Sequence, residues 1–168
     1  MEPIKNNSGK VSQHLDILIT IFFIIILGLV IAIPIIKKHI NRQRSAEGGI
    51  NLRKIYDAEV TYWGESKNEG KIPQFVSAPA TPEGTPGKEK RSGNWNHPSW
   101  KTLKFNPGTV RFTYNVQAEG VEQNASFTIF AVGDVDGDGE TCMFRRNLKI
   151  TRGEIYSGKG GMWIGDCD

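Results

Sequence analysis

The feature that most constrains this chain is an uncharged run of twenty residues, ILITIFFIIILGLVIAIPII, from Ile17 to Ile36. A helix of that length measures about 30 Å, which is the thickness of the hydrocarbon core of a bilayer. The apolar region of a removable signal peptide usually has only about 7–15 residues and precedes a small-residue cleavage site. Here the basic sequence Lys37-Lys38-His39 follows instead. The run therefore predicts a retained, single-pass transmembrane helix over 17–36, preceded by a polar tail over 1–16.

Basic charge is concentrated directly after this run. Residues 37–54 carry a net charge of +5, whereas the whole chain of 168 residues carries +3. Lys and Arg side chains beside a membrane span are attracted to anionic lipid head groups. No stretch of the sequence interleaves basic and aromatic residues as a nucleic-acid groove does. We therefore expect membrane lipid, and not nucleic acid, to be the partner of this region.

Two signals disagree on which side of the membrane the carboxyl-terminal domain lies. The positive-inside rule places the side that carries the Lys and Arg residues in the cytoplasm. Cys142 and Cys167 are the two cysteines of the chain, and an even number in a small tethered domain suggests a disulfide formed in an oxidising compartment. The alternative is two unrelated free thiols, and their spacing does not match a zinc site. We favour the disulfide and a domain outside the cytoplasm.

The helical pattern continues beyond the apolar run. Pro34 lacks the amide proton that would reach the carbonyl four residues earlier, so we expect the helix to bend there. The side chains that then recur at helical spacing form one mainly apolar face, and they are Leu52, Ile55, Tyr56 and Glu59, followed by Tyr62 and Trp63. This spacing predicts an amphipathic continuation of the helix over 37–66.

The remaining residues, 67–168, predict a globular head built on a β-sheet. Its first part, 71–108, holds six of the eight prolines and is expected to be a long irregular loop pinned by Trp95 and Trp100. Apolar and polar residues then alternate in segments separated by hairpin-length turns. The fold class is therefore α+β, with a long N-terminal helix packed on a small antiparallel sheet. The predicted strands are Thr109–Gln117, Ala125–Val132, Cys142–Ile150 and Glu154–Gly158.

The short segment with the most distinctive side-chain chemistry is the acidic turn GDVDGDGE, Gly133–Glu140. Asp134, Asp136 and Asp138 occupy alternate positions, and hard carboxylate oxygens at this spacing suit Ca²⁺. The bidentate Glu that closes a calcium hand is missing, because Arg145 stands in its place. The alternative is an Asp/Gly hairpin between two strands, where both residue types are favoured. The three aspartates are therefore a candidate for an unconventional calcium site.

Catalytic motifs are absent from the sequence. The histidines, His14, His39 and His97, do not combine with a motif-borne nucleophile, and there is no G-x-S-x-G, phosphate loop or dinucleotide fingerprint. The glycine-rich segment Ser157–Trp163 lacks the residue order of a phosphate loop. We expect no enzymatic activity, and no cofactor apart from the candidate Ca²⁺.

Taken together, these features resemble the type IV pilin and pseudopilin family. The resemblance covers residues 16 to 168, and its helical part consists of an Asp at the start of an apolar helix, Gly28, IAIP and the segment NLRKIYDAEVTYW. In the head it consists of SGNW, SWKTLKFNPGTVRFTYNV, FAVGDVDGDGE and a pair of carboxyl-terminal cysteines. The combination carries the resemblance, because no single motif is specific.

The resemblance implies a structural subunit of a type IV pilus or a type II secretion pseudopilus. Such a subunit is anchored in the inner membrane with its head in the periplasm, and it self-associates or joins other pilins in a surface filament through its N-terminal helix. Asp16 would then pair with a neighbour's terminal amine, and Pro34 would fit the helix into a packed bundle. The alternatives are an acid that marks the membrane surface and a tolerated membrane-helix proline.

The sequence departs from the family in the leader. Gly9 is followed by Lys10, and Asp16 is the seventh residue after Gly9, so the usual prepilin peptidase site is not matched. By this criterion the chain is a divergent member. The alternative function is a non-polymerising, single-span, membrane-anchored binding domain that faces the periplasm.

Overall fold

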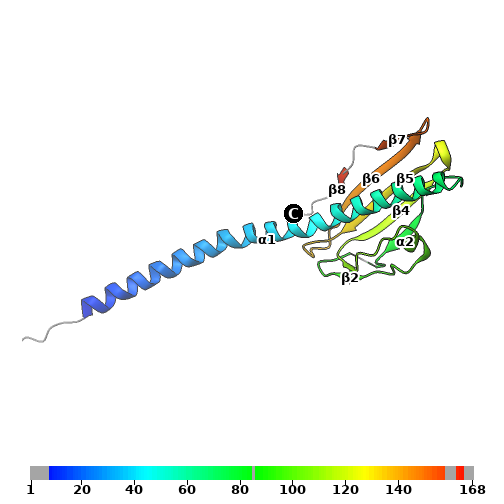
Figure 1. Cartoon of the computed structure of the whole chain (residues 1–168). Helices are drawn as coiled ribbons and strands as arrows, with labels where there is room; N and C mark the ends of the chain where they lie inside the picture. The colour runs from blue at the N-terminus through cyan, green and yellow to red at the C-terminus, as the bar shows by residue number, and fades with distance from the viewer. Residues whose placement is uncertain (1–7, 85, 158–161, 165–168) are drawn as a thin grey trace, which may run out of the picture. The chain divides into compact units, whose positions relative to one another are not determined.

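The computed structural model describes residues 8–84, 86–157 and 162–164. These residues form one long helix followed by a small antiparallel sheet, so the fold class is α+β (Figure 1). The elements in chain order are α1 (Ser8–Asn68), β1 (Ala78–Thr81), β2 (Arg91–Ser92), α2 (Pro98–Thr102), β3 (Thr109–Val110), β4 (Thr113–Glu119), η1 (Glu122–Asn124), β5 (Ser126–Gly133), β6 (Cys142–Thr151), β7 (Glu154–Ser157) and β8 (Met162–Ile164).

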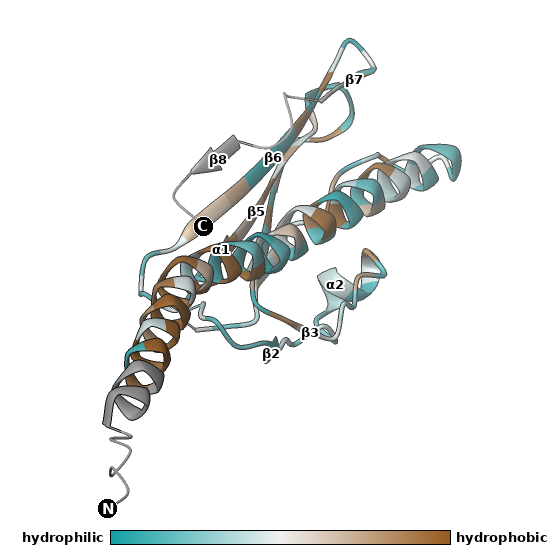
Figure 2. Cartoon of the chain, turned by 90° about the vertical axis from the view of Figure 1, so that its left-hand side faces the viewer, coloured by the Kyte–Doolittle hydropathy of each residue, from teal (hydrophilic) through white to brown (hydrophobic). Residues whose placement is uncertain are grey.

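Helix α1 contributes to two compact units of the chain. The first unit ends at Ile40, and the second, which we call the head, begins at Asn41. In the first unit the helix starts at Ser8, inside the expected polar tail, and it continues through Pro34. The large apolar side chains described in this unit are exposed, and they form the brown part of α1 in Figure 2. By length and composition, this helix can cross a membrane.

The main sheet of the head has six strands, and every pair of neighbours is antiparallel. The strand order is β1–β4–β5–β6–β7, and β8 pairs with the part of β6 that β7 leaves open. In the centre of the sheet, Ile129 of β5 lies opposite Val116 of β4 and Arg146 of β6. A separate two-stranded ribbon consists of β2 and β3. The strands predicted at Ala125–Val132 and Cys142–Ile150 are present as β5 and β6, with small differences at their ends. The strand predicted at Glu154–Gly158 is present as β7 up to Ser157, and Gly158 lies outside the described residues.

Within the head, α1 covers one face of the main sheet. Alternate residues of β5, such as Phe127, Ile129 and Ala131, are buried, and the rings of Phe127 and Tyr56 meet edge to face at 5.6 Å between centroids. Burial of such apolar surface stabilises the fold by about 25 cal/mol per Å². The buried residues of α1 recur at helical spacing and are Asn41, Ser45, Gly48, Asn51, Leu52, Ile55, Tyr56, Glu59, Trp63 and Ser66.

Two glycines allow α1 and the sheet to approach closely at one end of this interface. A Cβ atom at Gly48 would lie 2.9 Å from the ring of Phe144 and 3.0 Å from that of Phe112. A Cβ atom at Gly133 would lie 2.6 Å from the ring of Phe112. The two aromatic rings therefore occupy the space that side chains at these positions would need.

The segment 71–108 contains three short elements, β1, β2 and α2, between irregular stretches. Its prolines are compatible with these elements, because proline is tolerated in an edge strand such as β1 and in the first turn of a helix such as α2. The expected role of the tryptophans is confirmed, since Trp95 is 7% exposed and Trp100 is fully buried. The indole Nε1 of Trp100 donates to Thr81 Oγ1 at 3.0 Å, and that of Trp95 donates to the carbonyl of Gly108 at 2.6 Å.

The predicted strand Thr109–Gln117 is divided into β3 and β4. Arg111 lies at the break, and its backbone N–H donates to Glu47 Oε1 of α1 at 2.7 Å instead of to a neighbouring strand. The guanidinium of Arg111 lies 3.2 Å from Glu47 Oε2, and Lys90 Nζ lies 3.8 Å from the same oxygen. Glu47 thus ties the ribbon of β2 and β3 to α1, a long-range contact that strand periodicity does not reveal.

Candidate functional site

The acidic turn connects β5 to β6 and brings the three predicted metal ligands together. One carboxylate oxygen from each of Asp134, Asp136 and Asp138 lies within 4.8 Å of the others. Asp134 is 6% exposed, whereas Asp136 and Asp138 are exposed. The turn is therefore a compact acidic site with one buried and two accessible carboxylates.

Asp134 holds the turn in its conformation. Its Oδ1 accepts a hydrogen bond from the backbone N–H of Gly137 at 2.7 Å, and its Oδ2 accepts one from Gly139 at 3.2 Å. Both glycines have positive φ angles, of 80° and 93°, which other residues rarely adopt. Arg44 Nη1 donates to the carbonyl of Val135 at 3.0 Å and so fastens the turn to α1. The hairpin interpretation therefore accounts for Asp134 without a metal.

Asp136 and Asp138 each accept one hydrogen bond within the turn, whereas Asp134 accepts two. Asp136 Oδ1 accepts from the backbone N–H of Asp138 at 3.5 Å, and Asp138 Oδ1 accepts from Glu140 at 2.8 Å. A carboxylate accepts up to about four hydrogen bonds, so lone pairs remain for a cation. Hard oxygen donors this close together suit Ca²⁺, with water and backbone carbonyls completing its coordination. Arg145 lies on β6 opposite Phe130, so the arrangement is not that of a calcium hand.

We expect a saturating concentration of Ca²⁺ to raise the melting temperature of the full chain in detergent by about 5–10 °C. A cation that binds the folded state at about one hundred times its dissociation constant adds about 2.7 kcal/mol of stability. The double substitution Asp136→Asn and Asp138→Asn should abolish the shift, and the matched substitution Glu140→Gln should retain it. Scanning calorimetry with and without Ca²⁺ measures the difference. A calcium-dependent shift that survives the double substitution would place the ion elsewhere.

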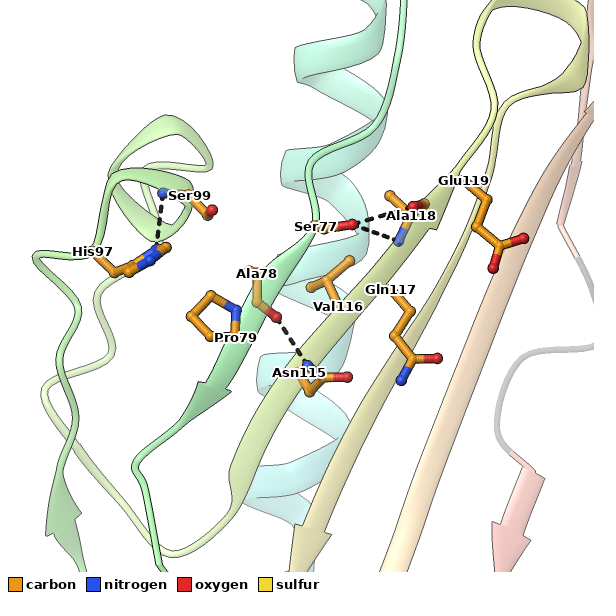
Figure 3. Close-up of a pocket in the computed structure, with 10 residues that line it drawn as sticks. All are labelled: Ser77, Ala78, Pro79, His97, Ser99, Asn115, Val116, Gln117, Ala118 and Glu119. Carbon is orange, nitrogen blue, oxygen red and sulfur yellow. Dashed lines mark hydrogen bonds between the residues drawn. The ribbon is translucent and has the colours of Figure 1, made fainter.

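A polar hollow of about 420 Å³ lies over β1 and β4 (Figure 3). Asn115 Nδ2 donates to the carbonyl of Ala78 at 3.0 Å. The hydroxyl of Ser77 donates to the carbonyl of Ala118 at 3.2 Å and accepts from the N–H of Ala118 at 3.0 Å. These bonds fasten the edge strand β1 to β4 next to an irregularity in their register. The side chains that make them therefore have a structural role.

Besides Ser77, the same hollow contains a histidine, a serine and a glutamate, but not in a catalytic arrangement. His97 Nδ1 accepts a hydrogen bond from the backbone N–H of Ser99 at 3.3 Å, which caps the start of α2. In Figure 3, Glu119 lies on the opposite side of the hollow from His97. A serine nucleophile needs its hydroxyl beside the imidazole, with a third group to orient the base. The three residues therefore do not form a catalytic triad.

Glu59 is a buried acid that the helical spacing placed on the apolar face of α1 but to which the sequence interpretation gave no role. It is fully buried on the face of α1 that packs against the sheet. Its Oε2 accepts from the backbone N–H of Val76 at 2.9 Å, whereas its Oε1 has no hydrogen-bond partner in the described part of the chain. Burial raises the pKa of Glu59 to about 8, and the bond from Val76 opposes this shift. A glutamate at helical spacing from Leu52, Ile55 and Tyr56 is the signal that could have revealed it.

Comparison with known proteins assigns no family to this arrangement. No family model, curated protein or solved structure matches the chain. The pilin resemblance therefore depends only on the motifs quoted in the sequence analysis. The positions of the residues that it implies are known only from the structure.

The residues implied by the pilin resemblance lie in different parts of the chain. Asp16 and Pro34 are exposed on α1 in the first unit, and the carbonyl of Asp16 accepts from Thr20 Oγ1 at 2.8 Å. Cys142 is 1% exposed at the start of β6. Cys167 lies outside the described residues, so its pairing with Cys142 stays a prediction.

Proposed function

We propose that this chain is a pilin-like structural subunit, anchored in a membrane by the first part of α1 and assembling with other subunits through it. One observation carries the proposal: the large apolar side chains described in the first unit are exposed. Phe22, Phe23 and Ile24, for example, are 61%, 64% and 64% exposed. Full burial of each such side chain would be favourable by about 1.5–3 kcal/mol, so we expect an apolar surface of this size to be in contact with lipid or protein and not with water.

Two environments can bury this apolar surface, namely membrane lipid and the equivalent helices of neighbouring subunits. Helix contacts in lipid gain little from the hydrophobic effect, so close packing and polar groups must guide them. Asp16 supplies a carboxylate near the start of the apolar part, and Pro34 removes one backbone hydrogen-bond donor from the helix. These features support assembly through α1 after anchoring.

The position of the basic residues supports a head that begins at the lipid surface. Lys37 and Lys38 lie near the end of the first unit, and the head begins at Asn41. Lys and Arg at such a boundary bind anionic head groups. We further propose that the head faces the periplasm, since the predicted disulfide between Cys142 and Cys167 needs an oxidising compartment.

A second candidate function is an anchored binding domain that does not polymerise. The observation that favours it is the leader sequence, in which Gly9 is followed by Lys10 and the usual prepilin peptidase site is missing. An unprocessed chain would keep its polar tail, and it would not offer a new terminal amine to Asp16 of a neighbour.

We expect a photoreactive phenylalanine analogue at Leu27 to cross-link the chain to copies of itself in the membrane fraction. Leu27 is 61% exposed in the apolar part of α1, where neighbouring subunits would pack. The same analogue at Lys149, which is exposed on β6, serves as the control and should give much less self-cross-linking. Denaturing gels measure the ladder of products, and mass spectrometry of the amino terminus shows whether the leader is cut.

The outcomes separate the two candidates. A self-cross-linked ladder from Leu27 together with a cut and methylated terminus between Gly9 and Ser12 supports the subunit. Lipid adducts alone, with an intact Met1, support the non-polymerising anchor. Recovery of the chain in the soluble fraction without detergent would overturn both.

A further inference from the structure

We propose that Asn124, in the turn between β4 and β5, is a modification site that accepts an N-linked glycan from a lipid-linked oligosaccharide. Glycans of this kind are added to chains that leave the cytoplasm, so the proposal rests on that part of the proposed function which places the head outside it. Two observations support it, namely a short sequence motif and the way in which the fold presents this motif to solvent.

The motif is Asn124-Ala125-Ser126, which has the form Asn-x-Ser with a residue other than proline in the middle. The hydroxyl at the third position binds the transferase, and proline is excluded from the second because its ring restricts the backbone. Glu122 lies two residues before the asparagine, and some oligosaccharyltransferases also require an acidic side chain at that position. A motif of three residues is common by chance, so its structural context is decisive.

The fold places the asparagine and the serine on the accessible side of the chain. Asn124 is exposed, Ala125 is fully buried and Ser126 is half-buried. The chain leaves η1 in an extended conformation, with Ala125 at φ −67° and ψ 136°, and neighbouring side chains of an extended chain point to opposite sides. Ala125 therefore enters the core, whereas the carboxamide and the hydroxyl on either side of it face away from the core.

The backbone around Asn124 is held in a tight turn at the end of the head where α1 terminates (Figure 1). The N–H of Asn124 donates to the carbonyl of Val121 at 3.0 Å, and that of Glu122 donates to the carbonyl of Pro73 at 2.8 Å. Gly120 has a φ angle of 71°, and a Cβ atom there would overlap the carbonyl of Asn124. The carboxamide of Asn124 forms no hydrogen bond with another described residue. Its nitrogen is therefore accessible to an enzyme that approaches from solvent.

The reaction transfers the glycan from a polyprenyl diphosphate to the side-chain amide. Nδ2 of Asn124 attacks the anomeric carbon of the first sugar, and the bond between that carbon and the diphosphate oxygen breaks. The diphosphate leaves with the electron pair of the broken bond, and the amide proton that the new C–N bond replaces passes to a base of the transferase. A glycan is bulky and strongly hydrated, so the modified turn would not be buried between neighbouring heads.

A second motif of the same form, Asn6-Asn7-Ser8, lies on the other side of the apolar run. Ile4, and not an acidic residue, lies two residues before its first asparagine. A single-pass helix places the two motifs on opposite sides of the membrane, so a transferase that acts on one side meets only one of them. A head outside the cytoplasm selects Asn124, whereas the reverse orientation selects Asn6.

The test is expression of the full chain in cells that contain an oligosaccharyltransferase and its lipid-linked donor, followed by mass spectrometry of the intact protein and its peptides. We expect the added mass of one glycan on the peptide that contains Asn124. The substitutions Asn124→Gln and Ser126→Ala should each remove this mass, whereas Ser126→Thr should retain it because threonine keeps the hydroxyl. Asn147→Gln changes an exposed asparagine of β6 outside any such motif, and as the matched control it should leave the glycan in place.

An acceptor tag fused to the carboxyl terminus reports separately on which side of the membrane the head lies. An unmodified Asn124 overturns the proposal in every case. If the tag is modified, the proposed orientation stands and the modification site alone is wrong. If the tag is unmodified and Asn6 carries the glycan, the orientation is wrong as well. A glycan that survives Asn124→Gln, or that is lost equally in Asn147→Gln, also overturns the proposal.

Discussion

The free energy of unfolding of the head is expected to fall by several kcal/mol between about pH 5 and pH 8, and the substitution Glu59→Gln should remove most of this fall. The cause is the buried carboxyl of Glu59, which is fully buried and whose pKa rises to about 8 from its ordinary value of 4.5. Each unit of pKa difference between the folded and unfolded states corresponds to about 1.4 kcal/mol.

The direction of the effect follows from where the proton is bound. Below pH 4.5 both states keep the proton on Glu59, so this group makes no pH-dependent contribution. Between pH 4.5 and about 8, the folded state keeps the proton and the unfolded state releases it, so stability declines as the pH rises. Above this range both states are ionised, and the decline from this group ends. Glutamine has nearly the same shape, can accept from the N–H of Val76 and does not titrate.

The measurement is denaturant unfolding of the wild-type chain and the Glu59→Gln chain in detergent at a series of pH values. The difference between the two curves isolates Glu59 from the other titrating groups. Glu65→Gln is a suitable control, because Glu65 is a glutamate on the same helix but is exposed to solvent. Its ion pair with Lys104 Nζ, at 3.9 Å, joins two exposed side chains and contributes little to stability. Parallel curves for wild type and Glu59→Gln would show that the buried carboxyl is not protonated in the folded state.

A second large effect is expected for Trp100→Ala, which should lower the free energy of unfolding by about 3–5 kcal/mol. Trp100 is fully buried, and its ring centroid lies 5.7 Å from that of Trp95 and 5.5 Å from that of Phe105. The substitution also leaves the buried hydroxyl of Thr81 without the indole donor. A domain of this size is usually stable by only about 5–15 kcal/mol, so a large part of its stability would be lost.

Chemical denaturation monitored by far-ultraviolet circular dichroism checks this expectation. Lys101→Ala changes the adjacent exposed residue and should alter stability by less than about 0.5 kcal/mol. Trp100→Phe should fall between the two, because it keeps part of the ring packing and loses the bond to Thr81. If Trp100→Ala were no more harmful than Lys101→Ala, the segment 71–108 would not depend on this side chain for its attachment.

The sequence predicts those parts of the fold in which apolar and polar residues repeat regularly or in which a short local motif is present. The helix, the alternating strands β5 and β6 and the acidic turn between them all carry local signals, because each is formed by residues close in the chain. The burial of Trp95 and Trp100 is also predictable, since large aromatic side chains in a proline-rich segment need a packed partner.

The parts that could not be predicted depend on contacts between distant residues. Strand β1 is short and includes Pro79, and it exists because it pairs with β4 some distance along the chain. At the break between β3 and β4 the backbone N–H of Arg111 donates to Glu47 of α1, a contact that no local pattern around Arg111 indicates. Helical spacing places Glu59 on the packed face of α1, but only the structure shows that its carboxyl is fully buried and that one of its oxygens has no hydrogen-bond partner among the described residues.

The edge strand β1 limits how the sheet of one head can pair with the sheet of another. Pro79 has no N–H to offer, and the register irregularity beside it interrupts the pattern that an incoming strand would need. Strand exchange or sheet extension at this edge is therefore disfavoured, even when many heads are concentrated in a small area. Neighbouring heads can then stay individually folded at high density, and amyloid-like stacking through this edge is avoided.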